Sequence, residues 1–119
     1  MHVAALVVAF LVGLLHVYIL ISESFRWGSP SVNRTFGVTP EQAAVLKPMA
    51  ANMGLYNGFL AAGLFWGLLA GDAMAQPILT FFLACVGIAG IVGTVTTGNR
   101  RIVIIQTVPA LLGLVLLWL

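Results

Sequence analysis

Residues 3–22 read VAALVVAFLVGLLHVYILIS and contain no Asp, Glu, Lys or Arg. As a helix this run is long enough to cross the roughly 30 Å hydrocarbon core of a bilayer, which takes about 20 apolar residues. It lacks the alternating polarity of a membrane barrel strand. It also lacks the basic start of a cleaved signal peptide, and further apolar runs follow it. We therefore predict a retained transmembrane helix.

The rest of the chain repeats this pattern. Hydrophobic residues make up 61% of the sequence and charged residues 7%, which leaves too few polar side chains to cover a soluble domain. Membrane-spanning helices are expected at about residues 3–24, 41–70, 74–97 and 100–118. We predict an all-α fold, an integral membrane bundle of four transmembrane helices that forms a single domain over residues 1–119. A long cytoplasmic loop connects the first two helices.

Basic residues set the expected orientation. They occur only in the first and third connections or in the first turns of the helices that follow them, at Arg26, Arg34, Lys47, Arg100 and Arg101. Short loops rich in Lys and Arg stay in the cytoplasm, so we expect both termini outside and the first and third connections in the cytoplasm. The net charge of +2 then reflects topology. No basic stripe with interleaved aromatic residues is present, which argues against nucleic-acid binding.

Two helix boundaries can be predicted from the sequence. Thr39-Pro40-Glu41-Gln42 has the pattern of a capping box with proline at the first helical position. Gly98 followed by Asn99 is typical of a helix stop and a new N-cap, which predicts a tight turn between the third and fourth helices. The single cysteine, Cys85, excludes an intrachain disulfide.

Polar residues inside the predicted helices gather in the cytoplasmic half of the membrane. His16 and Glu23 are seven positions apart and share a helix face, as do Asn52 and Tyr56, which are four apart. Asn57 points to a neighbouring face of the same helix. The outer halves of the first, second and fourth predicted helices, residues 3–13, 58–70 and 109–119, contain almost only apolar side chains. This asymmetry predicts a pocket that opens to one side of the membrane and not a pore.

The functional interpretation is a cavity entered from the cytoplasm or the inner leaflet. Histidine and glutamate can exchange protons, so we predict His16 and Glu23 as catalytic residues. Amide and hydroxyl groups can orient a ligand or stabilise a developing oxyanion. The predicted binding residues are Asn52, Tyr56, Asn57, Lys47 and Trp27. A structural interpretation stays open, because polar side chains often only join membrane helices to one another, and Glu23 is also spaced to pair with Arg26.

Small residues form narrow ridges on two of the predicted helices. They are Gly54, Gly58 and Ala62, then Gly63, Gly67 and Gly71, and on the third helix Ala84, Gly87, Gly90 and Gly93. Such ridges allow helices to approach closely, either within one chain or between copies. A homo-oligomer formed through these glycine-rich faces is therefore one expectation.

The sequence resembles a family of small membrane proteins known as domain of unknown function 1304. The resemblance covers nearly the whole chain and is carried by His16-Val17-Tyr18-Ile19, Glu23, Phe25, Trp27, Pro30, Phe36-Gly37, Lys47 and the run from Ala50 to Gly63. The Gly-Leu-Tyr-Asn-Gly segment at residues 54–58 is its most specific part. The resemblance implies four membrane spans and bacterial origin, hence the inner membrane, and supplies no assigned activity.

Three classes of function remain open. The first is a protein that binds, and isomerises or conjugates, a small lipophilic molecule through His16 and Glu23. The second is a small multidrug-type transporter, although alternating access needs a site near the midplane and Glu23 lies near the edge. The third is a non-catalytic accessory subunit. The sequence contains no recognisable haem or metal motif, because one histidine in the polar layer is too few ligands, and it leaves the cofactor open.

Overall fold

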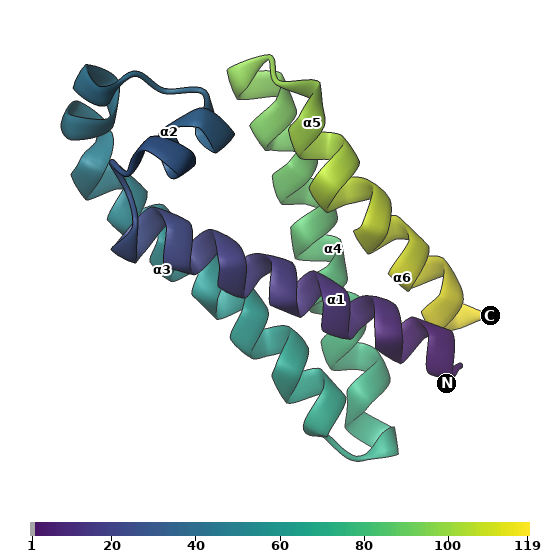
Figure 1. The fold of residues 1–119 in the computed structure, drawn as a ribbon. Helices are drawn as coiled ribbons and strands as arrows, with labels where there is room; N and C mark the ends of the chain where they lie inside the picture. The colour runs from purple at the N-terminus through teal and green to yellow at the C-terminus, as the bar shows by residue number, and fades with distance from the viewer. Residues whose placement is uncertain (1) are drawn as a thin grey trace. The chain divides into compact units, whose positions relative to one another are not determined.

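The computed structural model describes residues 2–119, which are almost entirely helical and contain no strand. The elements in chain order are α1 (Val3–Leu20), the π-helical turn η1 (Ile21–Phe25), α2 (Pro30–Phe36), α3 (Pro40–Leu69), α4 (Asp72–Thr97), α5 (Arg100–Ile102), the π-helical turn η2 (Val103–Thr107) and α6 (Val108–Trp118) (Figure 1). The prediction of an all-α fold is confirmed.

Both predicted helix boundaries are confirmed by their hydrogen bonds. The Thr39 amide donates to Oε1 of Gln42 at 2.9 Å, and the Gln42 amide donates to Oγ1 of Thr39 at 3.1 Å. This reciprocal pair is a capping box at the start of α3. Gly98 ends α4 with a φ of 74°, a left-handed conformation that glycine adopts without strain. The Asn99 side chain then accepts a hydrogen bond from the Arg101 amide at 3.0 Å.

The chain forms two compact units, whose boundaries fall inside α1 and α3. The four-helix unit contains the residues up to Leu14 together with Leu60–Leu119. The loop unit contains Leu15–Phe59, which includes the end of α1, the turn η1, α2 and the first two thirds of α3.

The core of the four-helix unit is built from α1, α3, α4 and α6. Its buried members are Ala5, Ala9, Val12, Leu64, Leu79, Leu83, Val86, Ala110 and Leu117. Small residues bring the helices close together: a Cβ atom on Gly67 of α3 would lie 2.6 Å from Cδ2 of Leu79 on α4. The start of α1 and the end of α6 lie side by side in this unit (Figure 1).

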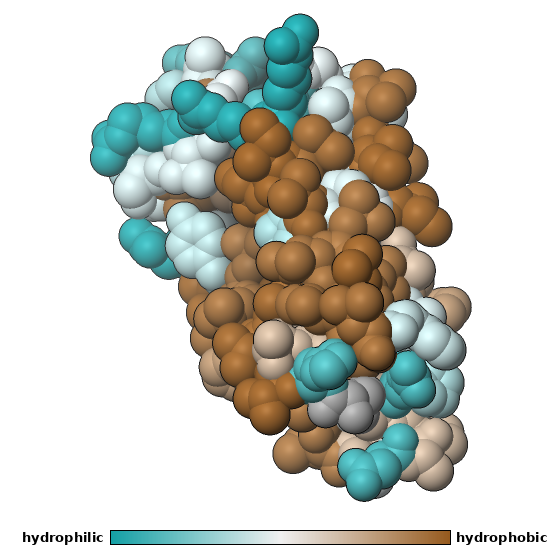
Figure 2. All heavy atoms as spheres, turned by 90° about the vertical axis from the view of Figure 1, so that its right-hand side faces the viewer, coloured by the Kyte–Doolittle hydropathy of each residue, from teal (hydrophilic) through white to brown (hydrophobic). Residues whose placement is uncertain are grey.

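The outer surface of the helices is largely apolar. Three helical stretches are long and apolar enough to cross a membrane, namely Val3–Phe25, Asp72–Thr97 and Arg100–Trp118. Large side chains such as Phe10, Ile88 and Leu112 are exposed, and apolar groups cover most of the face drawn in Figure 2. A water-soluble monomer rarely exposes so much contiguous apolar surface. These features indicate a membrane protein with transmembrane helices.

The helix α3, which corresponds to the second predicted span, is not among these three stretches. Its 30 residues are long enough for a span, but Asn52, Tyr56 and Asn57 lower the mean hydropathy of its middle part. The last third of α3, in contrast, is apolar and contributes the buried Leu64 to the core. That α3 is a fourth membrane span stays a prediction.

Candidate functional site

A π-helical turn at the end of α1 positions Glu23. The Arg26 amide donates to the Ile21 carbonyl at 3.0 Å, five residues back, so this turn accommodates one residue more than an α-helical turn. Within the turn, the consecutive residues Ser22 and Glu23 are both buried, with 2% and 4% of their surfaces exposed. Single π-turns of this kind are frequent at functional sites.

Glu23 meets Asn57 of α3. The Asn57 Nδ2 atom donates to Oε1 of Glu23 at 2.9 Å and to the Met53 carbonyl, one turn earlier on α3, also at 2.9 Å. The two amide hydrogens of Asn57 are therefore both used, and the side chain is held in one orientation. Among residues 2–119, neither Oε2 of Glu23 nor Oδ1 of Asn57 has a hydrogen-bond partner. The pair thus presents two unused oxygen atoms.

A second contact fastens the same turn to α3. Oγ of Ser24 donates to the Ala51 carbonyl at 3.0 Å. A Cβ atom on Gly54 would collide with this hydroxyl group and would lie 3.0 Å from the Ser24 amide nitrogen. Only glycine at position 54 allows the two backbones to approach this closely. Ser24 was not predicted from the sequence, although Gly54 in the small-residue ridge indicated a close approach at this level of α3.

His16 is fully buried on α1, about two helical turns before Glu23 of η1. Ile19 and Ser22, also buried, lie between them. The structure therefore turns both predicted catalytic residues into the protein interior. Arg26, the alternative partner of Glu23, instead directs its Nη2 atom to Oγ of Ser31 at 3.3 Å.

Three of the predicted binding residues lie away from this pair. Asn52, Tyr56 and Lys47 are exposed on α3, with 60% of Tyr56 accessible. At about 100° per residue, Asn52 lies roughly 200° around the helix from Gly54, which faces Ser24. Asn52 and Tyr56 do share a face, as expected, but that face is turned away from Glu23. Of the residues predicted on α3, the structure brings Asn57 to the carboxyl group.

Trp27 fastens the loop between α1 and α3. Its indole Nε1 donates to the Ala43 carbonyl at 2.8 Å, and its ring packs edge-on against Phe36 with 5.4 Å between the ring centres. The indole hydrogen is thus already used by the backbone of α3. The loop is folded, because this tryptophan ties α2 to the start of α3.

The four-helix unit contains a polar contact of the same design as that of Ser24. In the second π-helical turn, η2, Oγ1 of Thr107 donates to the Gly87 carbonyl of α4 at 2.8 Å. A Cβ atom on Gly90 would collide with this hydroxyl and would lie 2.9 Å from the Thr107 amide. In both places a hydroxyl group in a π-turn donates a hydrogen bond to a carbonyl of an adjacent helix. A glycine lies three residues after that carbonyl in the sequence. These contacts are interhelical joints.

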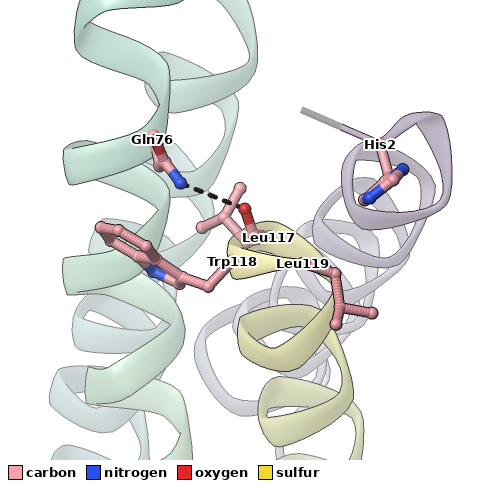
Figure 3. Close-up of a pocket in the computed structure, with 5 residues that line it drawn as sticks. All are labelled: His2, Gln76, Leu117, Trp118 and Leu119. Atoms are coloured by element: carbon pink, nitrogen blue, oxygen red, sulfur yellow. Dashed lines mark hydrogen bonds between the residues drawn. The ribbon is translucent and has the colours of Figure 1, made fainter.

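Two open hollows within the described residues 2–119 are lined by neither His16, Glu23 nor Asn57. One lies in the four-helix unit between His2, Gln76, Leu117, Trp118 and Leu119 (Figure 3). Within it, Nε2 of Gln76 donates to the Leu117 carbonyl at 3.1 Å. The other lies in the loop unit, between Gly28 and Pro40. Across residues 2–119, no group of three or more His, Cys, Asp and Glu side chains is placed to hold a metal ion.

Comparison with known proteins finds one family. The family model described as "Protein of unknown function (DUF1304)" matches residues 10–118, which include both π-helical turns and the Glu23–Asn57 pair. No curated protein and no solved structure matches the chain.

Proposed function

We propose, for a chain that belongs to the DUF1304 family, that the Glu23–Asn57 pair binds the polar group of a small lipophilic molecule. The observation that supports this proposal is the 2.9 Å hydrogen bond between Nδ2 of Asn57 and Oε1 of Glu23, a residue that is buried with 4% of its surface exposed. Ionisable groups inside membrane helices are costly, and they commonly serve a function.

The free oxygen atoms of the pair define the chemistry of the ligand. Oε2 of Glu23 and Oδ1 of Asn57 both accept hydrogen bonds, so a hydroxyl or amino group on the ligand is the natural partner. The helices around the pair are apolar, which favours a hydrocarbon body on the same molecule. We therefore infer a lipophilic alcohol or amine as the ligand class.

The proposed location follows from the charge pattern. In this proposal α3 is a fourth membrane span, both termini face outside and the loops that carry Arg34 and Arg100 are cytoplasmic. The pair then lies in the cytoplasmic half of a bacterial inner membrane, within reach of the inner leaflet. His16 lies two helical turns earlier on α1 and is fully buried.

Ligand binding to purified protein tests the proposal. Wild type and the variants Glu23→Gln, Asn57→Ala and His16→Ala are purified in mild detergent, and native mass spectrometry identifies any bound small molecule. Thermal unfolding is then measured with decanol, decylamine and decane as probes. We expect decanol or decylamine to raise the melting temperature of wild type, decane to have little effect, and Glu23→Gln and Asn57→Ala to weaken the response.

Ser24→Ala is the matched control. It removes the neighbouring interhelical hydrogen bond to Ala51 without touching the carboxyl group. We expect it to lower stability while it leaves the response to decanol and decylamine intact. An equal response to decane in all variants, with no bound molecule in wild type, would refute binding and favour a purely structural subunit. Uptake of a labelled amine into proteoliposomes would favour a transporter instead.

A further inference from the structure

The loop unit contains an open hollow beside α2. Residues between Gly28 and Pro40 line it, and its volume is about 490 Å³, inside the roughly 300 to 1,000 Å³ of common ligand pockets. We call it the α2 hollow. Most of its lining consists of glycine, proline and valine, and its polar side chains are those of Asn33, Arg34 and Thr39. An apolar wall with a few polar groups is the usual composition of a ligand site.

Asn33 has an unused acceptor next to the α2 hollow. The residue is buried with 7% of its surface exposed, and among residues 2–119 its Oδ1 atom has no hydrogen-bond partner. Its Nδ2 atom donates to the Gly28 carbonyl at 3.3 Å, which is longer than a typical bond of this kind. A buried amide oxygen without a donor is costly. Because the one bond is long, a small rotation of the amide brings Oδ1 to a donor that enters the hollow.

Arg34 places a positive charge at the same hollow. Its side chain is exposed, and among residues 2–119 no carboxylate pairs with it. None of the residues that line the α2 hollow is acidic. A guanidinium group binds phosphate through two parallel hydrogen bonds. A ligand that satisfies both Asn33 and Arg34 therefore carries an anionic oxygen and an N–H or O–H donor.

The position of the α2 hollow along the chain favours a ligand from the membrane surface. The apolar stretch Val3–Phe25, which is long enough for a membrane span, ends three residues before Gly28. Residues directly after a span lie among the lipid headgroups, which extend the bilayer from about 30 Å to about 40 to 45 Å. Trp27, a residue type enriched at this level, stands between the span and the hollow. Phosphate esters are abundant there.

We propose that the α2 hollow binds a phosphate ester that carries a primary ammonium group, the chemistry of a phosphatidylethanolamine headgroup. Arg34 pairs with the phosphate oxygens, and Oδ1 of Asn33 accepts a hydrogen bond from the ammonium group. Charge-assisted hydrogen bonds are the stronger ones, which favours ammonium over hydroxyl. A quaternary ammonium group has no N–H to donate. The inference is independent of the Glu23–Asn57 pair, because neither residue lines the hollow.

Thermal unfolding of delipidated protein in mild detergent tests the ligand class. The probes are dioctanoyl phosphatidylethanolamine, dioctanoyl phosphatidylcholine and dioctanoylglycerol, which lacks phosphate. We expect the first to raise the melting temperature most, the second less, and the third hardly at all. Soluble phosphoethanolamine distinguishes the two sources of the same chemistry. An equal response to it identifies a free ester as the ligand, and a response to the lipid alone identifies a membrane headgroup.

Two variants test the residues. Arg34→Gln should weaken binding of phosphatidylethanolamine about 2- to 5-fold. Arg101→Gln is the matched control, because it removes an exposed arginine that does not line the α2 hollow, and it should bind like wild type. Asn33→Leu should abolish the preference for phosphatidylethanolamine over phosphatidylcholine.

Three results would overturn the proposal. The first is an equal response of wild type to all three dioctanoyl probes. The second is no response to any of them, which would leave ordered water as the partner of Asn33. The third is an Asn33→Leu variant that loses the responses to phosphatidylethanolamine and phosphatidylcholine to the same extent, since Asn33 would then act only in folding the loop.

Discussion

Replacement of Gly54 by alanine is expected to separate the turn η1 from α3. The added Cβ atom would collide with the Ser24 hydroxyl and would lie 3.0 Å from its amide nitrogen and 3.1 Å from its Cβ atom. The hydroxyl can rotate away, which loses the hydrogen bond to Ala51 and costs about 0.6 to 2 kcal/mol. The backbone nitrogen cannot rotate, so the helices must shift, at a cost of about 1 to 3 kcal/mol.

The higher helix propensity of alanine offsets about 1 kcal/mol of this loss. The net expectation is a destabilisation of roughly 1 to 4 kcal/mol. Gly87→Ala is the matched control, because the nearest atom to its added Cβ is Cβ of Ala110 at 4.0 Å, an ordinary contact. It should leave stability unchanged or raise it by up to about 1 kcal/mol.

Unfolding by SDS in mixed micelles, followed by circular dichroism, measures both variants. The double variant Ser24→Ala/Gly54→Ala separates the two causes, since it removes the hydroxyl and leaves the backbone contact. Its cost should be smaller than the sum of the two single costs. If Gly54→Ala proves as stable as Gly87→Ala, the close packing of η1 on α3 is wrong, and so is the placement of Glu23 that depends on it.

Three further predictions concern the same unit and the topology. Asn57→Leu leaves the buried residue Glu23 without its hydrogen-bond donor and should lower the free energy of unfolding by about 1 to 3 kcal/mol in the same SDS assay. Adding Glu23→Leu should recover most of that loss of stability, whereas additive losses would contradict the pairing. Trp27→Phe keeps an aromatic ring but loses the indole hydrogen bond to Ala43, which loosens the loop. Trypsin should therefore cleave at Arg34 faster than in wild type, and an unchanged rate would argue against the folded loop. In a background without the native cysteine, a membrane-impermeant maleimide should label Asp72→Cys in intact cells and Arg34→Cys only after permeabilisation. The reverse labelling pattern would show that the proposed orientation is inverted.

Local chemistry along the chain was sufficient to predict the long helices and two of their boundaries. Apolar runs of about 20 residues predict helices because a backbone in hydrocarbon must satisfy its own hydrogen bonds. The start of α3 at Thr39 and the end of α4 at Gly98 were predictable because a cap depends on a few neighbouring residues. The π-helical turns were not predictable in this way, since nothing in Ile21–Phe25 distinguishes it from an α-helical turn.

Partner choice for Glu23 was decided only by the tertiary structure. Asn52, Tyr56 and Asn57 can all donate a hydrogen bond and lie within two turns of one helix, so composition cannot rank them as partners. The choice depends on how α3 is rotated about its own axis, where one residue corresponds to about 100°. Close packing of Gly54 against Ser24 sets that rotation. It turns Asn57 towards the carboxyl group and Asn52 and Tyr56 to the outside.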